Sequence, residues 1–418
     1  MKNFNSSEVI ITGLGVTSSI GQGQQAFSDS LLAGKHNFNI MQRPGRQYVS
    51  TNAKGDKETS QFLGAEINEL SMPQSISNSL LRTASFSSHV ALATLNEAWH
   101  DAQLDNIAAD RIGLVIGGSN FQQRDLLNTQ HKYQHSVPFI RPTYAMSFMD
   151  SDLCGLCTEV FDIKGLAYTV GGASASGQVA IIQAIEAVRS GQVDVCIAMG
   201  ALMDLSYWEC QGFRSLGAMG SDRYADKPAA ACRPFDQDRD GFIFGESCGV
   251  VVIEKADRAE GRRLKPYARL SGWAMGMDAN RNPNPSFEGE VNVIEKALKQ
   301  ANLTPDNIDY INPHGTGSHI GDITELKALR HCQLDHAYIN ATKSILGHGL
   351  SAAGTVEIIA TLLQMKAGKL HPTKNLENPM EADYNWVQHQ AVTHASQRAI
   401  NLSMGFGGMN TAICLEKI

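Results

Sequence analysis

The strongest constraint on the fold of this chain is a repeated alternation between short apolar runs and longer segments with helical spacing. Apolar runs of about four to eight residues that end in glycine-rich turns are typical of buried strands, and their alternation with helices predicts an α/β fold. In the first part of the chain we predict strands at EVIITGLG (8–15), RIGLVIGGS (111–119), YTV (168–170), DVCIAMGA (194–201) and GVVVIEK (249–255), with helices at 86–102 and 179–191. Because these runs are mostly apolar, we expect sheets that are covered on both faces.

The same type of alternation resumes after a charged segment near residue 256. The predicted strands of this second part lie in YARLSGWAMG (267–276), IDYINPHGTG (308–317), AYINATKS (337–344) and AINLSMGFGGMN (399–410), with helices at 288–303 and 352–368. The two parts show no close sequence repeat, and no low-complexity linker separates them. We therefore expect two halves of similar architecture, 1–255 and 256–418, that pack as one body.

Charge and hydropathy narrow the classes of partner. The 418 residues include 35 basic and 42 acidic side chains, a net charge of −7, and no basic run of the kind that follows a nucleic-acid backbone. No window approaches the ~20 apolar residues of a membrane span, and the N-terminus lacks the apolar core of a signal peptide. We predict a cytoplasmic protein that binds neither nucleic acid nor membrane.

The eight cysteines are scattered through apolar surroundings and show no disulfide-framework spacing. Cys154 and Cys157 form a CxxC pair, but no second such pair and no histidine pair at ligand spacing accompanies them. We interpret the cysteines as mostly reduced and buried, and this pair as neighbours on adjacent turns of a packed helix. No metal site is predicted.

Two other motifs match ligand sites only in part. GLGVTS (13–18) has Ser18 where a dinucleotide fingerprint has its third glycine, so we predict a tight turn between a strand and a helix. FDQDRDGFIFGES (235–247) has aspartates at calcium-loop spacing, but Ser247 stands where the loop needs a bidentate Glu. We predict a loop that is held by salt bridges of Arg233 and Arg239.

The stretch YTVGGASASGQVA (168–180) leads from a predicted strand into a helix, where proteins often mount a nucleophile. The residue at the turn is Ser174. GGASASG approaches the G-x-S-x-G elbow of α/β hydrolases, although Ser176 occupies the position of its second glycine. A triad would also need an acid ahead of its histidine in the later chain. Because the match to the elbow is only partial, an enzyme that uses Ser174 as an acyl nucleophile is kept as an alternative.

Two glycine-flanked histidines follow predicted strands in the second half. His314 lies in NPHGTGS and His348 in KSILGHGLSAAG, with Lys343 five residues before the second. Two neutral imidazoles whose N–H groups converge form an oxyanion site for a thioester carbonyl, which becomes negatively charged when the adjacent carbon becomes a carbanion. Decarboxylation of a malonyl thioester generates that charge. Lys343, paired with Glu357, is placed to hold the array and to bias its protonation.

Over nearly its whole length the sequence resembles the β-ketoacyl-acyl carrier protein synthases, or ketosynthases, of fatty-acid and polyketide assembly. The resemblance is carried by VIITGLGVTSSIG, LLAGK, RPFDQDRDGFIFGESCGVVVIEK, NPHGTGSHIGDITE, TKSILGHGLSAAGTVE and SMGFGGMN, in this order. It implies a homodimer with the thiolase fold, in which two similar halves each hold a mixed five-stranded sheet in α-β-α-β-α layers.

The resemblance also implies roles for the matching residues. The catalytic pair, the supporting lysine and its acidic partner are His314, His348, Lys343 and Glu357. Thr316 and Ser318 would line the channel for the phosphopantetheine arm of an acyl carrier protein, and Phe406 would be the gate. The nucleophilic cysteine of the family falls at Ser174. The sequence departs from the usual pattern at Pro313, at 317–319 and at Met409.

A serine at the nucleophile position changes the expected reaction. A helix N-terminus contributes only ~0.3–1 kcal/mol, which is too little to make a serine alkoxide near neutral pH. Accepting an acyl chain should be crippled, whereas decarboxylation needs no covalent nucleophile. The chain most resembles free-standing family members with Ser for Cys, which make acetyl-carrier protein from malonyl-carrier protein in polyketide β-branching cassettes, beside an HMG-synthase-like enzyme.

We therefore predict a malonyl-carrier-protein decarboxylase without a bound cofactor, whose substrate arrives on the phosphopantetheine arm of the carrier protein. Two alternatives stay open. One is a condensing synthase or acyltransferase that uses Ser174, and the other is a non-catalytic partner subunit like a chain-length factor.

Overall fold

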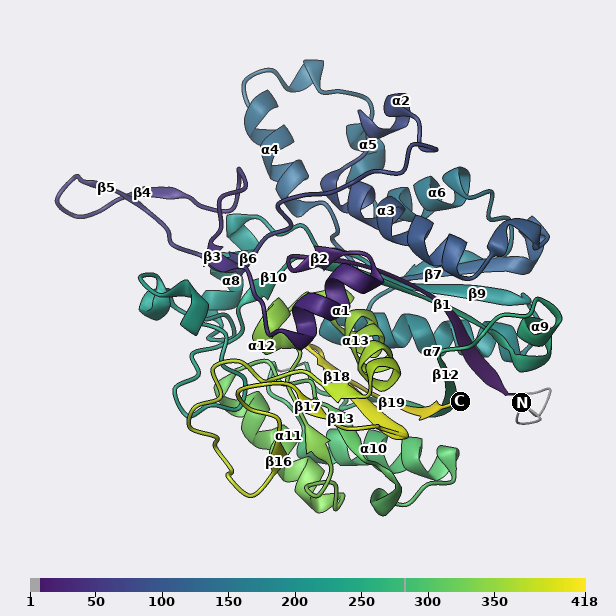
Figure 1. The fold of residues 1–418 in the computed structure, drawn as a ribbon. Coiled ribbons are helices and arrows are strands. Elements are labelled where there is room, and N and C mark those ends of the chain that lie inside the picture. The colour runs from purple at the N-terminus through teal and green to yellow at the C-terminus, as the bar shows by residue number, and fades with distance from the viewer. Residues whose placement is uncertain (1–7, 282) are drawn as a thin grey trace.

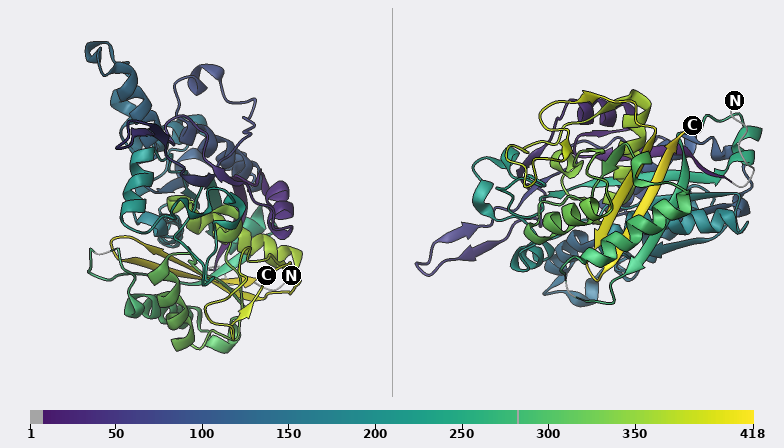
Figure 2. Two further views of the ribbon diagram at one scale, coloured as in Figure 1. Left: turned by 90° about the vertical axis from the view of Figure 1, so that its left-hand side faces the viewer. Right: turned by 90° about the horizontal axis from the view of Figure 1, so that it is seen from below.

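The computed structural model describes residues 8–281 and 283–418, which form a layered α/β structure (Figure 1). Two sheets are separated by a pair of helices, and further helices cover the outer face of each sheet (Figures 1 and 2). The predicted α/β class and α-β-α-β-α layer order are therefore present in the structure.

The first half supplies a mixed sheet of five long or medium strands. Their spatial order is β8 (Ala167–Val170), β7 (Ile112–Gly117), β9 (Val195–Gly200), β11 (Ser247–Lys255) and β1 (Val9–Ser18). β8, β7 and β9 run parallel, and β11 is antiparallel to both of its neighbours. Every residue of β7 and β9 is buried, as expected for strands covered on both faces.

The second half supplies a similar sheet with one extra strand. Its spatial order is β12 (Ala268–Met277), β19 (Met409–Lys417), β18 (Arg398–Gly405), β13 (Tyr310–Asn312), β14 (Tyr338–Ile339) and the short β16 (Asn385–Trp386). β1 pairs with β12 at only two positions, Ile10 with Arg269 and Ile11 with Ala268. The two sheets expected from the sequence are thus joined into one 12-stranded sheet among the described residues, in which β2 (Gly21–Gln22) lies off the main path and pairs with β1.

The two central helices are apolar on nearly all sides because each packs between the sheets. α7 (Ser176–Arg189) contacts β7 and β9 on one side and β12 and β19 on the other, and α13 (Ala353–Ala367) contacts β11 and β18. α3 (Phe86–Asp101) and α6 (Ser151–Val160) cover the first sheet, and α10 (Phe287–Ala301) and α11 (His319–His331) cover the second. Burial from both sides explains why the sequences of α7 and α13 lack a polar face.

The structure corrects the predicted turn at GLGVTS. β1 continues through Ser18, so Gly13 and Gly15 lie inside a strand. Helix α3 crosses this strand so closely that a Cβ on Gly15 would lie 2.1 Å from the Thr94 carbonyl oxygen, and one on Gly13 would lie 2.6 Å from the Ala102 Cβ. The glycines therefore permit close helix-on-sheet packing and do not form a turn.

The interpretations of the aspartate-rich loop and of the cysteines are confirmed. Arg233 Nε lies 3.1 Å from Asp236 Oδ1, and Arg239 Nε lies 3.9 Å from Asp322 Oδ2. The CxxC pair lies on adjacent turns of α6, and all eight cysteines are free and buried.

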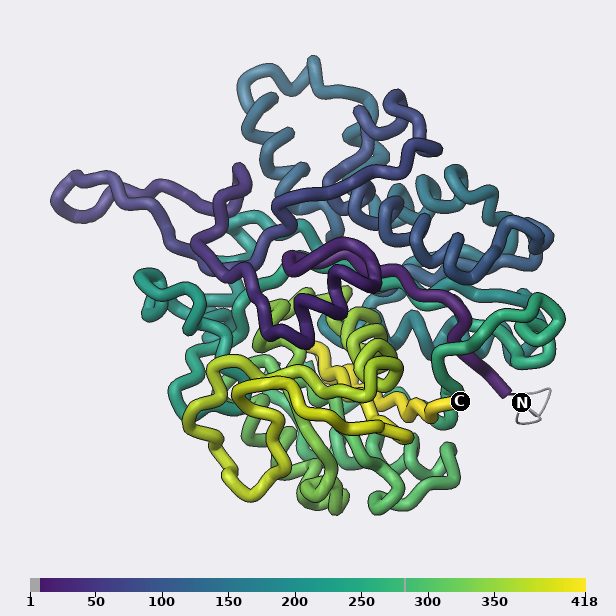
Figure 3. The backbone as a smooth tube through the Cα atoms, in the orientation of Figure 1, coloured from purple at the N-terminus to yellow at the C-terminus, as the bar shows by residue number. Residues whose placement is uncertain are grey.

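Several peripheral elements were not predicted. The hairpin of β4 (Val49–Thr51) and β5 (Lys57–Thr59) projects from the body, and α4 (Gln123–Tyr133) and α5 (Tyr144–Ser147) extend above it (Figure 1). The remaining elements used below are α8 (Tyr207–Ser215) and α12 (Lys343–Leu346). The tube in Figure 3 shows the start of β1 near the end of β19, since both flank β12. None of the helices in the described ranges is long and apolar enough to span a bilayer.

Candidate active site

Ser174 lies on a tightly braced turn between β8 and α7. It is the middle residue of a single 3-10 turn, Ala173–Ala175, and Ala173 has a positive φ of 48°. The Ser176 hydroxyl accepts a hydrogen bond from the Gly172 N–H at 2.9 Å and donates one to the Ala173 carbonyl at 2.7 Å. Ser176, which breaks the G-x-S-x-G pattern, thus holds the turn that presents Ser174 at the N-terminal end of α7.

The end of β18 packs directly on this turn. A Cβ on Gly405 would lie 2.1 Å from the Gly172 carbonyl oxygen, so only glycine fits there without a shift of the backbone. The next residue is Phe406, whose side chain is exposed and lies with its ring centroid 6.2 Å from that of Phe213 on α8. The predicted gate residue is therefore placed beside Ser174 by a backbone contact.

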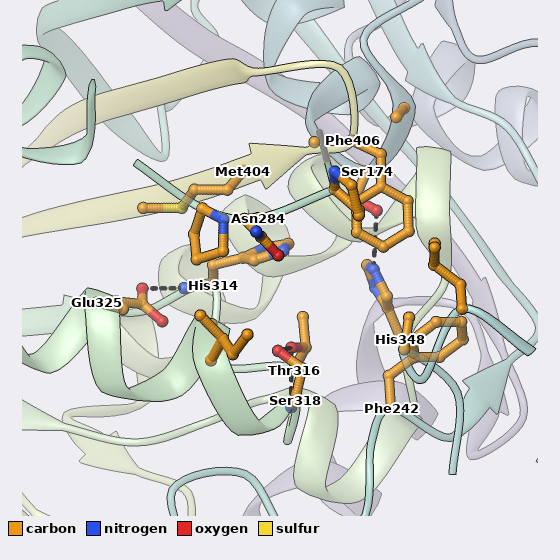
Figure 4. Close-up of a pocket in the computed structure, with 18 of the residues that line it drawn as sticks. Ser174, Phe242, Asn284, His314, Thr316, Ser318, Glu325, His348, Met404 and Phe406 are labelled. Carbon is orange, nitrogen blue, oxygen red and sulfur yellow. Dashed lines mark hydrogen bonds between the residues drawn. The ribbon is translucent and has the colours of Figure 1, made fainter. Parts of the chain in front are cut away.

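His348 enters the site from the loop after α12. Its backbone N–H donates to the Ile243 carbonyl at 2.7 Å, and its ring meets the Phe242 ring edge-on with centroids 5.2 Å apart. These two contacts fix a buried imidazole whose Nε2 lies 2.9 Å from Ser174 Oγ (Figure 4). The two halves of the chain therefore meet in one site.

His314 follows β13 and points into the same site. Its backbone N–H donates to Glu325 Oε1 at 2.5 Å, and the Gly315 N–H donates to Glu325 Oε2 at 2.8 Å (Figure 4). The rings of His314 and His348 are nearly perpendicular, with centroids 5.5 Å apart. Two imidazoles at this separation can both reach one oxygen atom of a ligand.

The predicted ion pair lies behind His314. Lys343 is 2% exposed, and its Nζ lies 2.5 Å from Glu357 Oε1 and donates a second hydrogen bond to the His314 carbonyl. Burial raises the pKa of Glu357 to about 7, against the opposing effect of the Lys343 charge. Neither side chain lines the cavity described below, so the pair acts on the site through His314.

The electrostatic surroundings keep both imidazoles neutral. Burial first, and then the Lys343 charge, hold the pKa values of His314 and His348 well below their usual range. Nδ1 of each ring is buried and has no hydrogen-bond partner among the described residues. A buried N–H without an acceptor costs about 1–3 kcal/mol, so we assign the proton of each ring to Nε2.

This assignment fixes the direction of the contact with serine. His348 Nε2–H donates to Ser174 Oγ and does not take its proton. A serine triad also requires a carboxylate that accepts a hydrogen bond from the histidine. Among the described residues, no carboxylate contacts His348 Nδ1. Ser174 thus lacks an activated base in this arrangement.

These groups share a cavity of about 390 Å³, a size suited to a small ligand or the end of a long one. Ser174, His314, His348 and the three residues predicted to bind substrate, Thr316, Ser318 and Phe406, all line it (Figure 4). The Thr316 hydroxyl donates to Ser318 Oγ at 3.1 Å, which orients both side chains on one wall. The sequence therefore predicted five of the polar side chains that line the cavity.

Three carboxyl groups of the lining were missed. They belong to Asp278 just after β12, Glu290 on α10 and Glu325 on α11. A signal for Glu290 was available, because it shares a helix face with Ile294 and Ala297, four and seven residues later, and both are fully buried. An acid on the apolar face of a helix indicates either a buried partner or a functional group.

Comparisons with known proteins agree with this architecture. The models "Beta-ketoacyl synthase, N-terminal domain" and "Beta-ketoacyl synthase, C-terminal domain" match residues 6–259 and 267–377. The polyketide biosynthesis malonyl-ACP decarboxylase PksF of Bacillus subtilis (strain 168) is 60% identical over 418 residues, which cover 100% of this chain and 98% of PksF. The 3-oxoacyl-[acyl-carrier-protein] synthase 2 of Synechocystis sp. is 31% identical over 429 aligned residues, which cover 100% of both chains.

A solved structure gives the same result for the fold. The crystal structure of a beta-ketoacyl synthase from Burkholderia phymatum STM815 has a TM-score of 0.86 at 24% identity and covers 98% of this chain and 99% of its own. Both domain models, the full-length relatives and the shared thiolase-like fold therefore establish that the chain belongs to the β-ketoacyl synthase family.

Proposed function

We propose that this protein decarboxylates malonyl-acyl carrier protein to acetyl-acyl carrier protein in polyketide biosynthesis. The observation that carries the proposal is the pair of neutral imidazoles that face one cavity beside Ser174, a serine without a base. The identity of 60% to a malonyl-ACP decarboxylase supports the same reaction.

The chemistry follows from the two N–H groups. The thioester carbonyl oxygen accepts hydrogen bonds from Nε2–H of His314 and His348. As the bond between C2 and the carboxylate breaks, CO2 leaves and its bonding electrons form an enolate on the thioester. The charge then sits on the oxygen that both imidazoles already contact, and such preorganised donors contribute about 10²–10³-fold each to the rate. C2 finally takes up a proton to give the acetyl thioester.

Lys343 and Glu357 position this array in the proposal. The Lys343 ammonium holds the His314 backbone and disfavours protonation of both rings, so each ring keeps a single N–H for the substrate. Ser174 fills the position beside His348 and accepts a hydrogen bond when the site is empty. Its hydroxyl is a spacer in this scheme and not a nucleophile, which disfavours the acyltransferase alternative.

The route of the substrate is part of the same proposal. Thr316 and Ser318 present hydroxyl groups suited to the amides of a phosphopantetheine arm, and Phe406 closes the cavity beside Ser174. No separate cofactor is needed, because the thioester arrives on the carrier protein.

We further propose that the protein works as a homodimer in the cytoplasm and passes acetyl-carrier protein to an HMG-synthase-like enzyme. β8 ends the path of the large sheet with an unpaired edge, and Tyr168 on it is partly exposed. α6 packs on β8 and on α5, where Met146 is 59% and Phe148 54% exposed. Exposed apolar side chains near an open strand edge fit a second copy of this chain. Eight buried free cysteines fit a reducing compartment.

The direct test is mass spectrometry of malonyl-carrier protein incubated with the protein. We expect conversion to acetyl-carrier protein with release of CO2. His314→Ala and His348→Ala should each slow it by about 10²–10³-fold, because each removes one oxyanion donor. Ser174→Ala should stay within about tenfold of the natural protein. An unchanged malonyl species would refute the proposed function, and binding of carrier protein without CO2 release would favour a non-catalytic subunit.

A further inference from the structure

The proposed reaction needs an acid that the groups described so far do not supply. A condensing enzyme uses its enolate to attack an acyl group, whereas here the enolate carbon must receive a proton. His314 and His348 use their only N–H groups on the carbonyl oxygen, and their low pKa values exclude a second proton. The Ser174 hydroxyl is far too weak an acid. Lys343 is turned away from the cavity, toward Glu357 and the His314 carbonyl.

Glu290 is a carboxyl group of this cavity without an assigned role. It lies in the first turn of α10, is 1% exposed, and lines the same cavity as Ser174 and both histidines. Its Oε2 is buried and has no hydrogen-bond partner among the described residues. No arginine, lysine or histidine within the described ranges forms an ion pair with it. A buried polar atom without a partner is rare and calls for an explanation.

Among the residues that the structure describes, the charged groups that most affect Glu290 are acidic. They are Glu325 and Asp322 on α11 and Asp278 just after β12. The helix N-terminus favours a carboxylate by only ~0.3–1 kcal/mol, whereas burial beside three other carboxyl groups opposes it more strongly. Burial, followed by the Glu325 charge, therefore raises the pKa of Glu290 well above its usual range.

Glu325 does not compete for the role of acid. Both of its oxygens accept hydrogen bonds from the backbone, from the His314 and Gly315 N–H groups (Figure 4). Its carboxyl group is thus committed to holding the loop that carries His314. Of the two glutamates that line the cavity, Glu290 is the one that is free to carry a proton and to release it there.

We propose that Glu290 is the general acid that protonates the enolate and so makes this site a decarboxylase that releases an acetyl thioester. This inference rests on the proposed function. The C2 electron pair released with CO2 takes the proton of the Glu290 carboxyl group, which becomes a carboxylate. Glu290 then regains a proton from solvent, past the partly buried Asp278 on the cavity wall. The sum is malonyl thioester carboxylate plus H⁺ giving acetyl thioester and CO2.

The test compares Glu290→Gln with the natural protein in the malonyl-carrier-protein assay across a range of pH. The substitution keeps the shape of the side chain and removes its acidic proton. Glu288→Gln is a matched control, because Glu288 lies two residues earlier in the same helix but is exposed and outside the cavity. Glu290→Asp keeps an acid, and it should recover part of the rate.

We expect Glu290→Gln to lower kcat by about 10²-fold or more with little change in KM, as for the loss of a general acid. The natural protein should lose activity at alkaline pH as Glu290 ionises. This alkaline limb of the pH–rate profile should be absent from Glu290→Gln. An unprotonated enolate can also recapture CO2, so the variant should incorporate dissolved ¹³CO2 into malonyl-carrier protein more than the natural protein does. Difference infrared spectra should show the C=O stretch of a protonated carboxyl group that is lost in Glu290→Gln.

Three results would overturn the inference. They are a Glu290→Gln rate within about threefold of the natural protein, a slower variant that keeps the alkaline limb, and the absence of a protonated carboxyl band from Glu290. Each can occur while the natural protein still releases CO2, and then the proposed function stands alone. A natural protein that releases no CO2 would refute both.

Discussion

Replacing Ser174 by cysteine should restore the first half-reaction of a condensing enzyme. The turn already presents this side chain at the N-terminal end of α7, and His348 Nε2–H lies 2.9 Å from its terminal atom. Both features favour an anion there. A thiol at this position should therefore be partly ionised near neutral pH, whereas the serine hydroxyl is not.

The expected thiolate fraction at position 174 can be compared with that of the native cysteines of the same chain. An unperturbed thiol is ~3% thiolate at pH 7, and the helix N-terminus raises this to roughly 5–15%. Burial raises the pKa of six native cysteines to about 12, which leaves on the order of 10⁻⁵ of each as thiolate. The new thiol should therefore react with iodoacetamide on the order of 10³–10⁴-fold faster than any of those six.

The assay is alkylation followed by peptide mapping, and then transfer of a labelled acyl group from acyl-carrier protein. We expect one alkylated site and one stable acyl adduct in Ser174→Cys, and neither in the natural protein or in Ser174→Ala. The reasoning would be wrong if the new thiol reacted no faster than the buried cysteines. It would also be wrong if the natural protein itself accumulated an acyl ester on Ser174.

Three further predictions concern the buried ion pair, the buried acid and the glycine that packs on the serine turn. Lys343→Met should destabilise the fold by about 3–5 kcal/mol because it leaves the Glu357 carboxyl group buried without its cation, and adding Glu357→Gln should recover much of this loss in urea unfolding. The folded-state pKa of Glu290 lies above its unfolded value. Its contribution to the free energy of unfolding is therefore complete at low pH and is lost as pH rises through the folded pKa, by up to ~1.4 kcal/mol per pH unit. In Glu290→Gln, the free energy of unfolding measured at several pH values should depend less on pH. Gly405→Ala should reduce activity strongly because its Cβ would meet the serine turn, whereas Gly212→Ala, with open space on α8, should leave activity unchanged and thermal stability equal or higher.

The sequence predicted the core strands because their residues are apolar on both faces, as in the fully buried β7 and β9. The prediction of a turn at the end of β1 was wrong, because two glycines inside a strand look the same in sequence as two glycines in a turn. Only the path of α3 across them shows the difference. α4 was missed because it is polar along most of its length, with Leu126 and Leu127 as its only aliphatic residues, so it offers too few apolar positions to mark a helix in sequence.

The site was predictable where chemistry leaves a local pattern. His314 and His348 each follow a strand and stand beside glycines, and both face the cavity. The direction of the hydrogen bond to Ser174 was not predictable, because it depends on what surrounds Nδ1 of His348 in three dimensions. The buried acid Glu290 stands on the apolar face of its helix, which the sequence shows, but only the structure shows that this face borders the cavity.

The seam between β1 and β12 has a consequence for how this protein loses activity. Ser174 follows β8 of one sheet and His314 follows β13 of the other, yet only two residue pairs of backbone bonding join these two sheets. Helices α7 and α13 lie between the sheets and each contacts strands of both, so a shift of these helices would move Ser174 relative to His314. A displacement of about 1 Å is enough to impair a preorganised site. The rate of CO2 release should therefore respond to small shifts between the two sheets. Mild urea should abolish CO2 release before circular dichroism records any loss of secondary structure.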